Sequence, residues 1–184
     1  MAIESYQSGP RGRVPNSRFP LLVYRNAVPG GGEEHVKNRF VQNGWLNNWL
    51  YPGIYEYSHF HSTTHECLGC ASGWMDIVIF GKGGEKVRLS AGDILLMPAG
   101  VSHEMVGHSD DVMMVGGYPD GRDWDNVQEE FLSEENFRAA AKRIMMLPIP
   151  SRDPANGEPI EQWLHAPPST EGWNDYRDAL DASS

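Results

Sequence analysis

Three histidines and one glutamate in the middle of the chain have the residue types and the spacing of ligands for a single metal ion. His59 and His61 stand two residues apart, so on a β-strand both side chains would leave the same face. Glu66 follows a short polar turn, and His103 comes much later. Imidazole nitrogens and a carboxylate oxygen suit a divalent first-row transition ion. The sequence therefore predicts one metal site formed by these four residues.

Two motifs contain the four residues, and their fixed positions are similar to those of the cupin superfamily. The first has the pattern G-x5-H-x-H-x4-E-x6-G and runs from Gly53 to Gly73. The second, G-x5-P-x-G-x2-H-x3-N, has its fixed residues at Gly92, Pro98, Gly100 and His103. It departs from the pattern at Gly107, where the family usually has asparagine. That asparagine is not a metal ligand in the family, so the departure bears on local turn structure.

Three further stretches resemble the YjlB-like subgroup of single-domain cupins. They are His-Phe-His-Ser-Thr-Thr-His-Glu at 59–66, Gly-Gly-Tyr-Pro at 116–119 and Asp-Pro-Ala-Asn-Gly at 153–157. With them, the resemblance extends over most of residues 20–165. It implies an all-β fold, a single double-stranded β-helix (the jelly-roll cupin barrel) with a few short flanking helices. It implies a metal site but no particular reaction.

Local patterns predict mostly short strands separated by turns. The predicted strands are 21–24, 45–50, 54–61, 66–70, 74–80, 86–89, 94–97, 103–106 and 112–117. A helix is predicted at 33–42, ended by Asn43-Gly44, and another from a cap at Ser133 to about Met145. Eight or more short strands with regular turn signals favour a sandwich or barrel.

The length of 184 residues suits one domain with a sizeable core. Residues 1–19 are expected to form an N-terminal arm without periodicity, residues 20–165 the cupin domain, and residues 166–184 a C-terminal tail. The core barrel is predicted at about 45–118, with a helical and loop extension at 119–165. The residues predicted to anchor the C-terminal region are Trp163, Leu164 and Trp173.

Composition narrows the classes of partner. The net charge of −10 argues against binding to nucleic acid or to an anionic membrane surface. No apolar run approaches the ~20 residues of a membrane span, and the N-terminus has no signal-peptide core, so a cytoplasmic protein is expected. Cys67 and Cys70 have C-x-x-C spacing. On a strand they face opposite ways, so we expect two small buried residues rather than a disulfide or a metal pair.

The remaining candidates for the site are less constrained. Tyr57 and His65 are the candidate catalytic residues, and for His65 a pocket or second-shell position is favoured over ligation. Strand alternation places Tyr55 and Tyr57 on the face of His59. These two tyrosines and Met105 are candidates for the pocket wall, and the alternative is that they fill the interior of the barrel. Tyr118 is expected near the mouth. No inward-facing arginine or lysine is predicted on the strands, although Arg122 lies in the turn after the last one.

These ligands accept iron, manganese, nickel or zinc, with iron slightly favoured, at one divalent ion per chain. Four protein ligands would leave positions open for a small molecule with a carboxylate, an enolate or vicinal oxygens. The first hypothesis is therefore a metal-dependent enzyme that acts on a small organic molecule, with a dioxygenase-like oxidoreductase slightly ahead of an isomerase or lyase. The alternative is a non-catalytic, metal-containing module that binds or senses a small molecule.

The resemblance also implies a homodimer, because cupins commonly pair through an exposed sheet edge or swapped terminal strands. The strand near residues 21–25 is the segment predicted to make this contact.

Overall fold

The structure is a computed structural model that describes residues 1–166. The predictions for Trp173 and for the tail lie outside the described residues. In chain order the elements are β1 (Ala2–Tyr6), β2 (Leu21–Arg25), α1 (Glu33–Gln42), β3 (Trp45–Tyr51), β4 (Glu66–Ser72), β5 (Trp74–Ile79), β6 (Glu85–Ser90), β7 (Ile94–Met97), β8 (His103–His108), β9 (Met113–Pro119), η1 (Glu129–Phe131), α2 (Glu134–Met146) and α3 (Glu161–Leu164).

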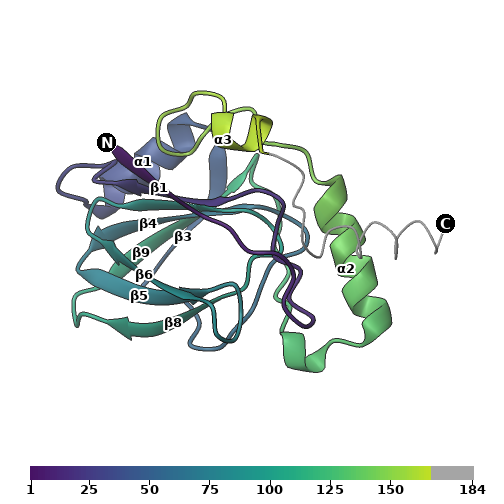
Figure 1. The fold of residues 1–184 in the computed structure, drawn as a ribbon. Coiled ribbons are helices and arrows are strands. Elements are labelled where there is room, and N and C mark those ends of the chain that lie inside the picture. The colour runs from purple at the N-terminus through teal and green to yellow at the C-terminus, as the bar shows by residue number, and fades with distance from the viewer. Residues whose placement is uncertain (167–184) are drawn as a thin grey trace.

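Two antiparallel sheets form the body of the fold (Figure 1). The larger has the strand order β1-β2-β7-β4-β9-β3, and the smaller has the order β6-β5-β8. Apart from β1 and β2, the neighbours in the larger sheet are not consecutive strands, because the chain crosses repeatedly from one sheet to the other. This is the double-stranded β-helix, or jelly roll, and it confirms the fold predicted from the sequence.

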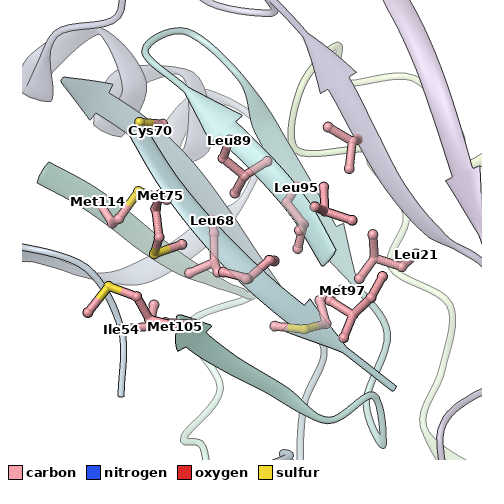
Figure 2. Packing of buried hydrophobic residues seen from close by; sticks show 14 of the residues in the cluster. Leu21, Ile54, Leu68, Cys70, Met75, Leu89, Leu95, Met97, Met105 and Met114 are labelled. Carbon is pink, nitrogen blue, oxygen red and sulfur yellow. The ribbon is translucent and has the colours of Figure 1, made fainter. Parts of the chain in front are cut away.

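The main core lies between the sheets and takes alternate residues from strands of both. Leu68 and Cys70 of β4 contribute to it, as do Leu95 and Met97 of β7. From the smaller sheet come Met75, Ile77, Ile79, Val87, Leu89 and Met105. Figure 2 shows side chains of this cluster gathered between strands of the two sheets. Alternation follows from the pleat, which points successive side chains to opposite faces.

A second apolar cluster covers the outer face of the larger sheet. Val36 and Phe40 of α1 pack there against the strand side chains that point away from the main core, including Cys67. Trp163 of α3 is buried in the same cluster, as predicted, whereas Leu164 is 52% exposed and does not act as an anchor. Because both faces of the larger sheet are covered, its central strands are apolar on both sides.

The two cysteines are free and belong to different apolar clusters, on opposite faces of β4. Burial raises the pKa of both thiols, that of Cys67 well above its usual value and that of Cys70 to about 12. The expectation of two buried, unpaired residues is thus confirmed.

Secondary structure agrees closely with the sequence patterns at the helices. The bounds of α1 are those predicted, and α2 begins after Ser133, whose Oγ accepts a hydrogen bond from the backbone N–H of Asn136 at 3.1 Å. This is the N-cap that the sequence predicts.

Four predictions about strands need correction. Residues 54–61 form no regular strand, because neighbouring residues pair with different segments: His59 bridges to His103, and Phe60 bridges to Val127. Residues 2–6 of the proposed arm form β1, which pairs with β2. Since β2 also pairs with β7, it is not the free edge expected for a dimer contact. Gly107 lies within β8, beside a bulge opposite Asp76, rather than in a turn.

The Asp-Pro-Ala-Asn-Gly stretch ties the C-terminal region to the larger sheet. The buried Asp153 accepts hydrogen bonds from the backbone N–H groups of Ala155 and Asn156, and from the hydroxyl of Tyr24 in β2. No helix within the described residues is long and apolar enough to cross a membrane.

Replacing Tyr24 with phenylalanine tests this tie. The change leaves an oxygen of the buried Asp153 without its hydroxyl donor, and we expect the free energy of unfolding to fall by about 1–3 kcal/mol. Urea denaturation measures the difference. The control is Tyr51→Phe, because this ring is 57% exposed, and its effect should stay within about 0.5 kcal/mol. Equal stability of Tyr24→Phe and the unmodified protein would contradict a structural role for this contact.

Candidate metal centre

His59, His61 and His103 converge at one end of the barrel. All three are buried, and one nitrogen from each lies within 4.8 Å of the others. His59 and His61 come from the segment before β4, and His103 is the first residue of β8. Backbone hydrogen bonds between His59 and His103, at 3.2 Å and 2.9 Å, hold these two segments side by side. The structure thus brings together three of the four ligands predicted from the sequence.

Glu66, the first residue of β4, reaches the same point. Its Oε2 lies 3.4 Å from Nε2 of His61 and 3.5 Å from Nε2 of His103. It is buried like the histidines. The arrangement therefore presents three imidazoles and one carboxylate toward a common centre, the donor set that a divalent transition ion accepts.

Each histidine is oriented by a backbone carbonyl on its outer side. Nδ1 of His59 donates to the carbonyl of Tyr57 at 2.9 Å, and Nδ1 of His103 donates to the carbonyl of Val101 at 3.0 Å. Nδ1 of His61 donates to the carbonyl of Asp125. Because a carbonyl can only accept, Nδ1 carries the hydrogen in each ring. The Nε2 lone pairs are then free for a metal, as in most histidine metal sites.

Electrostatics favour the uncharged form of two of the rings. Burial lowers the pKa of His59, and it lowers the pKa of His103 well below the usual value, with a further contribution from the neighbouring imidazoles. Burial also acts on His61, but the adjacent Glu66 carboxylate offsets it, and the pKa of His61 lies above its usual value. His59 and His103 are therefore ready to bind a cation at neutral pH.

The turn before His103 depends on the glycine of the second motif. Gly100 has φ 93°, a left-handed conformation that other residues rarely adopt, and a Cβ there would overlap the backbone oxygen of Asn16. Its N–H donates to the carbonyl of His61 at 2.8 Å. This turn therefore links the two motifs directly.

Tyr118 orients the glutamate. Its hydroxyl donates to Oε1 of Glu66 at 2.9 Å and accepts from Nε1 of Trp49 at 2.8 Å. Oε2 of Glu66 is then the oxygen that faces the histidines. Burial, together with Glu66, raises the pKa of Tyr118 far above its usual value, so the hydroxyl keeps its proton. The close approach of Trp49 requires Gly116, because a Cβ there would overlap the indole ring.

A loop after β9 supports His61 from outside the barrel. The Asp125 carboxylate accepts from the backbone N–H groups of Ser62 and Thr63 and from both of their hydroxyls. Arg143 of α2 donates to the same Ser62 hydroxyl, at 2.9 Å and 3.1 Å. Asp125 therefore fixes both the peptide after His61 and, through its own carbonyl, the His61 ring.

A cavity of about 540 Å³ opens onto the centre, within the range of small-molecule sites. The four predicted ligands line it. The aromatic residues of its wall are Trp49, Tyr51, Tyr55, Tyr118 and Trp124. Asn47 and Asn48 add neutral amides. Glu66 is the one charged residue among the lining residues of the described chain.

The other candidates fall in different places. Tyr55 lines the cavity and Tyr118 lies at the centre, whereas Met105 is buried in the core between the sheets. Tyr57 stacks on Tyr55 at 4.9 Å and contacts His59 edge-on, but it does not line the cavity. Arg122 is exposed and does not line it either.

His65 points away from the other histidines. Its Nδ1 accepts from the backbone N–H of Ala99 at 2.9 Å, and its Nε2 faces the carbonyl of Pro148 at 3.3 Å. Its ring packs against Phe19 and Trp163. Burial lowers its pKa to about 4. The structure thus places His65 outside the pocket, in contacts between the 98–100 turn and the chain after α2.

Sequence reasoning missed Trp49, Trp124 and Asp125. Trp49 falls in a predicted strand, and its pattern gives no sign of a site role. The Asp-Trp-Asp stretch at 123–125 has no periodicity that would place it near the histidines. The spacing of Tyr118 and Trp124 around a turn is the one available signal that this loop folds back on the barrel.

Comparisons with known proteins place the chain among the cupins. The family model Cupin_2, which describes a cupin domain, matches residues 50–115 of this chain. The uncharacterized protein YjlB of Bacillus subtilis is 35% identical over 158 residues, which cover 83% of this chain and 92% of that protein.

Two of the solved structures that match part of the chain are enzymes. The TDP-quinovose 3,4-ketoisomerase WlaRB of Campylobacter jejuni matches 47% of this chain and 73% of its own, with 23% identity and a TM-score of 0.39. The acireductone dioxygenase of Bacillus anthracis, with a cadmium ion in its active centre, matches 51% of this chain and 62% of its own, with 17% identity and a TM-score of 0.38.

Removing a ligand should abolish metal binding. We expect the unmodified protein to hold about one divalent ion per chain and His59→Ala or His103→Ala to lose it. Elemental mass spectrometry of the anaerobically purified protein measures the content. His108→Ala is the matched control, because His108 is an exposed histidine at the far end of β8. Full metal content in His103→Ala would contradict the proposed ligand set.

Asp125→Ala tests the support of His61. The variant keeps the Asp125 carbonyl but loses the carboxylate that fixes this loop on Ser62 and Thr63. We expect the affinity for metal to fall about 10–100-fold, because the carbonyl is then no longer held in place against the His61 ring. Competition with a chromogenic chelator measures this affinity. Asp123→Ala is the control, since Asp123 is exposed in the same loop. An equal loss in both variants would show a general effect of the loop rather than the Asp125 contacts.

Proposed function

The chain belongs to the cupin family, and from this membership we propose that it is a metal-dependent enzyme acting on a small organic molecule. One observation carries the proposal. Nε2 of three buried histidines and Oε2 of Glu66 face a common centre, and this centre opens onto a cavity large enough for a substrate. The full set of His59, His61, Glu66 and His103 is proposed to hold the ion.

The wall of the cavity offers little acid–base chemistry of its own. Within the described chain, Glu66 is the one carboxylate that lines it, and no lysine does. The Tyr118 hydroxyl is already engaged with Glu66 and Trp49. A bound divalent transition ion would supply Lewis acidity or, with iron, oxygen chemistry. This supports a dioxygenase-like oxidoreductase first and an isomerase or lyase second.

The residues around the centre have separate tasks in this proposal. The carbonyls of Tyr57, Asp125 and Val101 hold the three imidazoles in the tautomer that binds metal. Tyr118 keeps Oε2 of Glu66 turned toward them. The aromatic rings of the wall would cover part of a bound substrate and remove that part from water, which strengthens electrostatic interactions within the site. A cytoplasmic location and a homodimer also remain predictions.

A metal-dependent screen tests the enzyme. The protein is loaded separately with iron(II), manganese, nickel and zinc, and then assayed for O₂ consumption with diols, thiols and enols and for isomerisation or elimination by NMR. We expect turnover with one metal, reduced at least about 100-fold in His59→Ala and Glu66→Ala, because catalysis depends on the ion. His108→Ala should retain full activity. Stoichiometric metal with no turnover of any compound would instead favour the binding or sensor module.

A further inference from the structure

The charge of the pocket points to one class of ligand. Glu66 is the one charged residue that lines the cavity within the described chain, and the polar groups beside it are neutral amides and hydroxyls. A divalent ion balanced by this single carboxylate would leave a local charge near +1. This positive charge is concentrated at the metal. A negatively charged group of a ligand would therefore be compensated only where it reaches the metal.

The aromatic rings define the shape of the ligand. Trp124 contacts His61 edge-on at 5.5 Å and stacks with Tyr118 at 6.3 Å, with 18° between the rings. Tyr55 contacts a different histidine, His59, at 5.2 Å. Trp124 and Tyr55 thus lie next to separate ligands of the same centre, and Trp124 is still 37% exposed. A flat molecule bound at the centre would meet aromatic surface beside it, which favours planar apolar ligands.

Resting on the proposed metal centre, we propose that the pocket takes a small planar molecule whose only charged group is a pair of oxygens that reaches the metal. Catechols, enediols and aromatic 2-hydroxy ketones belong to this class. Phosphorylated or multiply anionic compounds, such as nucleoside diphosphates, do not. Their additional charges would enter an aromatic cavity in which no lining side chain is a cation, and burying a charge without a partner is costly.

The test compares two chelators that differ in charge. Both 4-nitrocatechol and catechol-3,5-disulfonate are catechols with the same pair of oxygens, but the first carries an uncharged nitro group and the second carries two anionic sulfonates. Both are titrated into the metal-loaded full-length protein by calorimetry. We expect 4-nitrocatechol to bind at least about tenfold more tightly, because the sulfonates find no cation in the wall. Equal or tighter binding of the disulfonate would overturn the proposal.

Three variants separate the causes. Trp124→Ala should lower the affinity for 4-nitrocatechol about tenfold, because the ligand loses an aromatic contact and the area buried in it. Trp124→Phe should restore most of this affinity. Phe131→Ala, which removes an aromatic side chain that is 74% exposed and does not line the cavity, should change nothing. Leu50→Lys adds a cation to an exposed position in the wall and should narrow the difference between the two chelators.

Metal content is measured before and after each titration. A protein that takes up no metal would contradict both the proposed function and this inference. Extraction of the metal by either chelator would appear as a lower metal content after the titration. In that case the titration is repeated with a pair that chelates more weakly, kojic acid and its phosphate ester at the hydroxymethyl group, because both keep the same pair of chelating oxygens. Bound metal with a preference for the anionic compound would overturn the ligand class alone.

Discussion

Burial of three imidazoles and a carboxylate within a few ångströms is the constraint on which the rest of the site depends. Polar groups removed from water must find hydrogen-bond partners. Each histidine meets this requirement on its outer side with a backbone carbonyl, and Glu66 does so with the Tyr118 hydroxyl. The inner atoms are left facing one another, an arrangement that a shared cation satisfies better than hydrogen bonds among the four groups.

The partners that orient the ligands come from very different parts of the chain. Two of the carbonyls lie two residues before their own histidines, so they arise from local geometry. The third belongs to Asp125, and the carboxylate of the same residue binds the peptides after His61. Through Ser62 this contact continues to Arg143 of α2. The C-terminal extension therefore supports the centre even though it contributes no ligand.

The two-sided burial of the larger sheet gives this centre a rigid base. Central strands such as β4 and β7 place alternate side chains in separate cores, one between the sheets and one under α1 and α3. A shift of one residue in register would exchange the two cores, so the register is strongly determined. Glu66 is the first residue of β4 and pairs with Met97 of β7, so this register also fixes its position.

The sequence alone determined the barrel class, both longer helices and the four candidate ligands, because strand alternation, helix caps and motif spacing are local and survive in the linear pattern. The tertiary structure decided which neighbours these residues meet. Residues 54–61 form isolated bridges to distant segments instead of a strand, and His65 binds the backbone of Ala99 instead of lining the pocket. Trp124 and Asp125 contact His61, although they lie in a loop after the last strand. These outcomes depend on contacts between distant segments, and no local periodicity encodes how a loop after the last strand folds back across the mouth of a barrel.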